Sequence, residues 1–120
     1  MKNLYILGAG GFGHVIKDVA EQSGKYKSIQ FLDDNSNEAV GKISEVNIYN
    51  TSDACFFVAL GNNETRLCLI NKLLAINCDV VSLIHPTAYV SPTVKLGIGC
   101  CVLPMAVVNT DSIIKDGCII

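Results

Sequence analysis

The sequence has little of what nucleic-acid-binding proteins and membrane proteins require. It has nine Lys and Arg against eleven Asp and Glu, a net charge of −2 at pH 7, and the basic residues are scattered. Because nucleic-acid binding depends on concentrated positive charge, nucleic acid is not an expected partner. No apolar run is long enough to span a bilayer, and no signal-peptide pattern is present. We therefore expect no membrane insertion and a cytoplasmic location.

The sequence also lacks the C-x-x-C spacing of zinc and redox sites, although it contains six cysteines. Cys55 opens an apolar run, and Cys68 lies within a helical pattern. A buried thiol behaves as a small hydrophobic group. We therefore interpret the cysteines as free, mostly buried thiols and predict no metal site.

Half of the residues are hydrophobic and 17% are charged, which is typical of a well-buried fold. In the first part of the chain, continuous apolar runs alternate with amphipathic helical patterns. This alternation predicts a small Rossmann-like domain, in which helices cover both faces of a parallel sheet. The expected strands are residues 3–7, 29–32, 46–49, 56–60 and 80–84, and the expected helices are residues 14–22 and 64–76. In the second helix, the residues expected to face the sheet are Leu67, Ile70, Leu73 and Leu74.

The segment from Gly8 to Gly13 matches G-x-G-x-x-G between a predicted strand and a predicted helix, and Asp33 follows twenty residues later. Such glycines allow a sharp turn and let a phosphate approach the backbone N–H groups of a helix N-terminus. An acidic residue after the second strand can bind ribose hydroxyls or a base. The alternative is a glycine turn that only packs the helix against the strand.

The glycine motif does not specify NAD, because any ligand with a phosphate next to a ribose suits the same chemistry. A full dinucleotide fold needs two mononucleotide-binding units, and the predicted sheet has room for about half of one such fold. A mononucleotide or a nucleotide-sugar therefore fits the sequence better than a dinucleotide.

A six-residue repeat occupies the last part of the chain, and neither a helix nor a strand has this period. Its aliphatic positions are Ile84, Val90, Leu96, Val102, Val108, Ile114 and Ile120. Four places after each of the first six come compact residues: Ala88, Val94, Cys100, Ala106, Ser112 and Cys118. This pattern predicts a parallel β-helix with three sides per turn, and the six full repeats would form two coils.

We thus expect two domains, a nucleotide-sugar-binding domain at residues 1–83 and a β-helix at residues 84–120. Solenoids are stabilised by stacking and need capped ends. Ile120 would open a seventh repeat, so we interpret the 120 residues as the front part of a longer protein.

The pairing of these two parts resembles the hexapeptide-repeat sugar acyltransferases, which include UDP-4-amino-sugar N-acetyltransferases and sialic acid O-acetyltransferases. The resemblance covers the whole chain. It rests on residues 6–11 with Gly13, on residues 31–34, on residues 58–63 with Arg66, and on residues 83–86. It implies a left-handed β-helix, a homotrimer in the full-length protein, and acetyl-CoA as co-substrate between neighbouring β-helices. No cofactor is expected on the fragment itself.

The resemblance also implies which residues bind the acceptor, expected to be a UDP-amino-sugar or a similar nucleotide-sugar. These residues are Gly10, Gly11, Phe12, Asp33, Asp34 and Gly61. The glycine turn would approach the acceptor, the two aspartates would bind the base or ribose, and Gly61 would line the same cleft. Many members carry His at the position of Phe12, so any polar contact of that side chain is lost or replaced by packing.

In such enzymes a β-helix histidine removes a proton from the sugar amine or hydroxyl as it attacks the thioester. That histidine falls beyond the equivalent of Ile120, so no catalytic residue is assigned and this chain is expected to transfer no acetyl group. His14, in the first turn of a helix, is interpreted as solvated or packed. His85, beside Pro86, is interpreted as a residue that caps the coil or binds the linker.

Two further interpretations remain open. The glycine motif and Asp33 would also fit an NAD-binding oxidoreductase or sensor domain, and nucleotide preference separates that possibility from the acetyltransferase. A non-catalytic assembly module would bury its open coil against a partner and bind no nucleotide.

Overall fold

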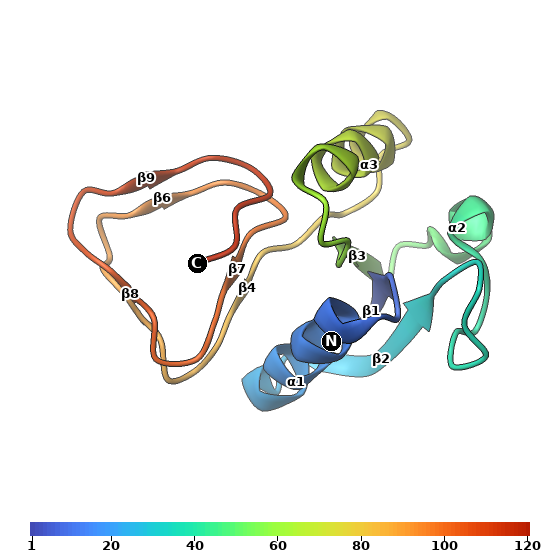
Figure 1. Cartoon of the computed structure of the whole chain (residues 1–120), viewed down its shortest axis with the longest axis horizontal. Coiled ribbons are helices and arrows are strands. Elements are labelled where there is room, and N and C mark those ends of the chain that lie inside the picture. The colour runs from blue at the N-terminus through green and yellow to red at the C-terminus, as the bar shows by residue number, and fades with distance from the viewer.

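A computed structural model describes all residues 1–120 and places a three-stranded α/β unit beside a triangular coil (Figure 1). The α/β unit contains β1 (Lys2–Leu7), α1 (Gly11–Ser23), β2 (Tyr26–Leu32), the 3-10 turn η1 (Ile43–Glu45), α2 (Val46–Tyr49), β3 (Ala54–Val58) and α3 (Asn63–Ala75). The coil contains six two-residue strands: β4 (Leu83–Ile84), β5 (Tyr89–Val90), β6 (Lys95–Leu96), β7 (Cys101–Val102), β8 (Val107–Val108) and β9 (Ile113–Ile114). No helix is both long enough and apolar enough to cross a membrane.

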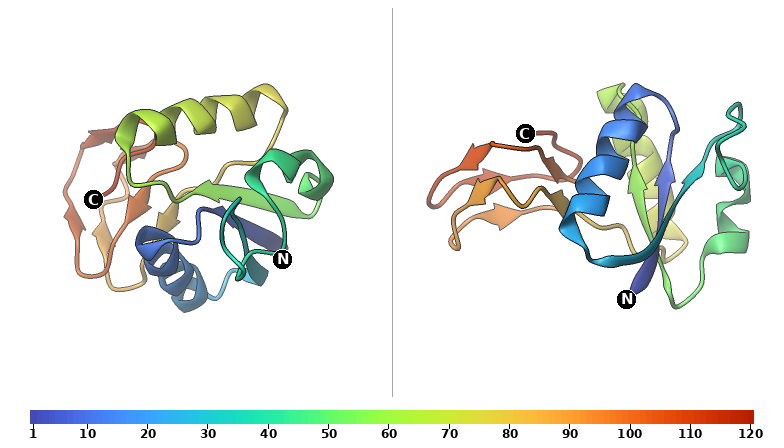
Figure 2. Two further views of the ribbon diagram at one scale, coloured as in Figure 1. Left: turned by 45° about the vertical axis from the view of Figure 1, so that its right-hand side comes forward. Right: turned by 90° about the horizontal axis from the view of Figure 1, so that it is seen from below.

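The three strands of the α/β unit are parallel, in the order β2-β1-β3. Helices α1 and α3 lie on opposite faces of this sheet (Figure 2). The alternation of side chains along β1 explains both cores, because Leu4 and Ile6 pack toward α1, whereas Leu7 packs with Ile70 of α3. The predicted Rossmann-like parallel sheet is therefore confirmed.

The ends of both long helices follow simple local rules. The side chain of Asn62 caps α3 by accepting a hydrogen bond from the Thr65 N–H at 2.9 Å. Helix α1 ends at Gly24, whose φ of 65° is left-handed, and glycine adopts this conformation at little cost. These caps fix where each helix begins or ends relative to the sheet.

The coil makes two stacked turns with three flat sides (Figure 1). Strands β4, β5 and β6 pair in parallel with β7, β8 and β9, so that Leu83 lies against Cys101 and Tyr89 against Val107. This offset of eighteen residues equals three six-residue repeats per turn. Inside the coil, Cys100 and Val102 are completely buried, as the repeat predicts, whereas Ile84 and Ile120 at the first and last repeat positions are exposed.

The coil packs directly on the α/β unit. Leu83 and Cys101 belong to the same buried cluster as the core side of α1. From α3, the side chain of Ile70 reaches the backbone of Gly99 and Gly117, and a Cβ on Gly99 would lie 2.8 Å from Ile70 Cδ1. Both glycines have a positive φ, so a side chain at either position would be strained as well as crowded.

Three local predictions are wrong. Residues 46–49 form α2 instead of a strand, because the Glu45 carboxylate accepts the Lys42 N–H and starts a helical turn. Residues 80–84 do not form a strand of the α/β sheet, since Val80 makes a single bridge to Phe56 and Leu83–Ile84 form β4 of the coil. In α3 the side chains of Leu67 and Leu74 are exposed, and the buried residues are Arg66, Ile70 and Leu73.

Candidate acceptor site

The carboxyl ends of β1, β2 and β3 meet at one edge of the sheet, where ligands bind in open α/β folds. The glycine turn follows β1, Asp33 follows β2, and Gly61 comes three residues after β3. The chain passes from β1 to β2 on one side and then to β3 on the other, so the direction of winding reverses at β1. The Ala59 N–H donates to Leu7 O at 2.8 Å, which holds the β3 end against the turn.

Two glycines of the motif are required by the fold. Gly8 has φ +109°, and a Cβ there would lie 2.7 Å from Ala59 O. A Cβ on Gly13 would overlap Gly8 O, because α1 is in direct backbone contact with the turn. These positions therefore exclude any larger residue for reasons of conformation and packing alone.

Gly10 and Gly11 differ, because nothing in the protein lies within 4 Å of a Cβ built on either one. Gly10 is the N-cap of α1 and provides no side-chain cap, and the first turn of the helix holds no acidic residue. The N–H groups of Gly11 and Phe12 make no hydrogen bond within the chain. The turn thus presents free backbone donors at the positive end of the helix dipole, an arrangement that suits an anion.

Asp33 lies beside the glycine turn. Its Oδ2 accepts from the Ala9 N–H at 2.8 Å, and its Oδ1 accepts from the Asn35 N–H at 2.9 Å. These two backbone hydrogen bonds, led by that of Ala9, lower the pKa of the Asp33 carboxyl below its ordinary value of 3.8. The ionised carboxylate therefore stiffens the turn and retains acceptor capacity for a ligand hydroxyl.

Asp34 is exposed, and its Oδ1 accepts from the Ile43 N–H at 2.9 Å. It thereby fixes η1 relative to the end of β2. Phe12 is partly buried against the core cluster on the α1 face of the sheet. Gly61 is exposed, and a Cβ added to it would have no neighbour within 4 Å, as at Gly10.

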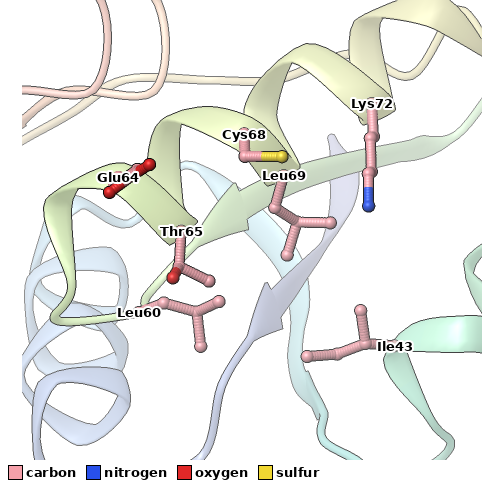
Figure 3. A pocket seen from close by; sticks show the side chains of 7 residues that line it. All are labelled: Ile43, Leu60, Glu64, Thr65, Cys68, Leu69 and Lys72. Atoms are coloured by element: carbon pink, nitrogen blue, oxygen red, sulfur yellow. The ribbon is translucent and has the colours of Figure 1, made fainter.

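A cavity of about 410 Å³ lies on the α3 side of this edge. Thr65, Leu69 and Lys72 extend from α3 toward the cavity, and Leu60 and Ile43 form the wall below it in the view of Figure 3. The remaining lining residues are Glu64 and Cys68. The walls are mainly aliphatic with a few polar groups, and the volume lies in the range of small-molecule sites.

Each of the two histidines has a polar partner close to it. His14 Nε2 lies 3.2 Å from Glu38 Oε1, at the exposed surface. His85 Nδ1 accepts from the Thr87 N–H at 3.0 Å, which fits its predicted role in the linker. No three His, Cys, Asp or Glu side chains gather in a metal-binding cluster.

The cysteines are unpaired, and Cys68 is the one that is exposed. Burial raises the pKa of the Cys55 thiol to about 11 and that of the Cys101 thiol to about 12. These thiols stay protonated at neutral pH and fill space as small hydrophobic groups.

Sequence reasoning missed Arg66 as a buried residue at this edge, with 5% of its surface exposed. Its guanidinium donates to backbone and side-chain oxygens of the β3 end, of α3 and of the coil. One signal was available, since Arg66 follows Asn62 by one helical turn and shares a helical face with Ile70 and Leu73.

Comparison with known proteins gives a consistent result. The sequence is 31% identical over 109 residues to a UDP-N-acetylbacillosamine N-acetyltransferase of Bacillus subtilis, a match to 82% of this chain and 50% of the relative. The acetyltransferase domain of PglB from Neisseria gonorrhoeae superimposes with a TM-score of 0.94 at 34% identity, over 99% of this chain and 62% of that one. The same domain has been solved in complex with acetyl coenzyme A.

A mutant of perosamine N-acetyltransferase from Caulobacter crescentus, in complex with CoA and GDP-perosamine, gives a TM-score of 0.89 at 28% identity, over 99% of this chain and 60% of that one. The chain spans about half the length of the curated relative. Residues 3–73 match the family described as the PglD N-terminal domain. Because that match spans more than half of the 120 residues, the chain belongs to the PglD N-terminal domain family.

Proposed function

We propose that this chain is the acceptor-binding part of an acetyl-CoA-dependent N-acetyltransferase that acts on a nucleotide-sugar in surface glycan biosynthesis. The observation that supports this most strongly is the glycine turn, where Gly10 and Gly11 leave open space and free N–H groups at the sheet edge. The similarity to sugar N-acetyltransferases supports an amine as the acetylated group.

In this proposal the diphosphate of the nucleotide-sugar lies at the glycine turn and the N-terminus of α1. Asp33 holds the turn and accepts a ribose hydroxyl. The base enters the cavity between α3 and η1, whose wall at Ile43 is fixed by Asp34. Phe12 packs beside the ligand, and Gly61 leaves room for it on the β3 side. The same six residues, Gly10, Gly11, Phe12, Asp33, Asp34 and Gly61, thus remain the proposed binding set.

The reaction transfers an acetyl group from a thioester to the sugar. The amine nitrogen attacks the thioester carbonyl of acetyl-CoA, the C–S bond breaks, and CoA leaves as the thiol while the nitrogen loses a proton to a base. No residue of this chain is assigned as that base. The proposal also includes a left-handed β-helix at residues 84–120, beyond a nucleotide-sugar-binding domain at residues 1–83, with a homotrimeric, cytoplasmic full-length protein.

Calorimetric titration tests the proposal directly. The chain is titrated with UDP, a UDP-amino-sugar, a GDP-amino-sugar and NADH in one buffer. Binding of a nucleotide-sugar without binding of NADH is expected, with loss of binding in Gly10→Ala, whose methyl group meets nothing in the protein. A preference for NADH would replace the proposal with a dinucleotide-binding function, and binding of none of the four would refute it.

A further inference from the structure

We infer that Arg66 is a positioning residue, which aims the backbone N–H groups of Gly61 and Asn62 at the acceptor ligand and ties them to the coil. The inference rests on the proposed function. It starts from the burial of a guanidinium, since arginine is rarely fully buried without a partner.

The guanidinium of Arg66 joins three separate parts of the chain. Nη1 donates to Leu60 O at 3.0 Å and to Gly61 O at 3.3 Å. Nη2 donates to Asn63 Oδ1 at 2.8 Å, and Nε donates to Gly117 O of the coil at 2.9 Å. A guanidinium can bridge three parts of the chain because it is planar and rigid, and its N–H groups point in several fixed directions.

The two carbonyl contacts at the β3 end determine the direction of two N–H groups. In a trans peptide the C=O and the following N–H point in opposite directions, and this chain has no cis peptide bond. Because Leu60 O and Gly61 O both face Arg66, the N–H groups of Gly61 and Asn62 point away from it. Neither N–H makes a hydrogen bond within the chain, and both residues are exposed.

The charge of Arg66 strengthens these donors. No carboxylate lies within ion-pair distance of the guanidinium, and its hydrogen bonds go to backbone carbonyls and one side-chain amide oxygen. A cation bound to a carbonyl oxygen polarises the peptide and makes its N–H a better donor. Gly61 and Asn62 therefore match an anionic or oxygen-rich ligand at the β3 side of the edge, opposite the glycine turn.

The bond to Gly117 connects this donor pair to the coil. Ile70, one turn further along α3, also touches the coil at Gly99 and Gly117, but its apolar side chain cannot donate a hydrogen bond to the Gly61 turn. The two residues thus provide a matched comparison. Arg66 contacts both the coil and the donor pair, whereas Ile70 contacts the coil and the sheet core but makes no hydrogen bond to the donor pair.

The test uses the full chain with Arg66→Lys, with Asn63→Ala as a milder second variant, and with Ile70→Val as the control. A lysine ammonium cannot reach the β3 carbonyls and Gly117 O together. Nucleotide-sugar affinity is measured by calorimetry, and amide signals of Gly61 and Asn62 are followed by NMR during titration. We expect Arg66→Lys to lose tenfold or more in affinity and Asn63→Ala a smaller amount, with Ile70→Val within twofold of the wild type.

The outcomes separate the two hypotheses. If the wild type binds no nucleotide-sugar, the proposed function fails and this inference fails with it. If the wild type binds but Arg66→Lys and Asn63→Ala bind equally well, the positioning role alone is refuted. The positioning role is also refuted if the Gly61 and Asn62 amide signals do not shift on binding, because the donors would then not face the ligand.

Discussion

Substitution of single glycines in the turn after β1 separates a binding role from a folding role. In Gly11→Ala the new methyl group meets nothing within 4 Å, and the backbone at this position has no positive φ. Replacing a glycine in a compatible conformation reduces the freedom of the unfolded chain and stabilises a protein by about 0.4–1 kcal/mol. We therefore expect Gly11→Ala to unfold at a temperature a few degrees higher than the wild type.

The same substitution should weaken ligand binding. If a phosphate lies against the backbone of the turn, the methyl group at Gly11 occupies the space that the ligand needs. A tenfold loss of affinity corresponds to about 1.4 kcal/mol, and we expect at least this loss for a UDP-amino-sugar. Stability and binding would thus change in opposite directions, a result that a disturbed fold cannot produce.

Gly13→Ala is the contrasting variant. Its Cβ would overlap Gly8 O, and a backbone atom cannot move aside as a flexible side chain can. Overpacking of this kind costs about 3 kcal/mol or more, a large part of the roughly 5–15 kcal/mol that stabilises a typical domain. Urea unfolding followed by circular dichroism, together with calorimetric titration, measures both effects. If Gly11→Ala binds the nucleotide-sugar as tightly as the wild type does, the turn only packs helix against strand and the reasoning is refuted.

Three further predictions concern other parts of the chain. The folded-state pKa of Asp33 is depressed, so its stabilising effect is complete above its ordinary value of 3.8 and is lost as the pH falls through the folded-state value. In urea titrations from pH 6 to pH 2, Asp33→Asn should lose less stability with acid than the wild type, and parallel curves would contradict this. Asn62→Ala removes the α3 cap on Thr65 and should cost about 1 kcal/mol by urea unfolding, whereas an unchanged midpoint would argue against the cap. Alkylation of the native protein, followed by mass spectrometry, should modify exposed Cys68 first, and simultaneous labelling of the buried thiols would show that the core opens easily.

The sequence predicts the sheet edge that carries the candidate site, because each part of that edge has a strong local signal. β1 is a continuous apolar run that ends in glycine, and Asp33 directly follows the apolar end of β2. The glycines at positions 8 and 13 are dictated by backbone geometry, which leaves a pattern that can be read without a structure. The six-residue repeat is equally local, since each repeat supplies one side of the coil.

The failures have a different origin, because they depend on what a segment packs against. Residues 46–49 have the composition of a strand, but the preceding 3-10 turn continues directly as α2. The apolar pattern of α3 predicts that Leu67 and Leu74 are buried. In the structure Arg66 is buried instead, because carbonyl oxygens of the coil and of the β3 end accept hydrogen bonds from its guanidinium. A propensity argument treats arginine as a surface residue, so only the tertiary contacts reveal its position.

The coil contacts the α/β unit on both sides of the proposed acceptor site. Leu83 and Cys101 complete the buried cluster beneath α1, the helix whose N-terminus forms part of the glycine turn. On the other face of the sheet, Arg66 joins the Gly61 turn to Gly117. The two sides of the proposed acceptor site thus each rest on the coil through a different contact, one apolar and one polar. A substitution inside the coil can therefore alter acceptor binding through either contact without touching the ligand.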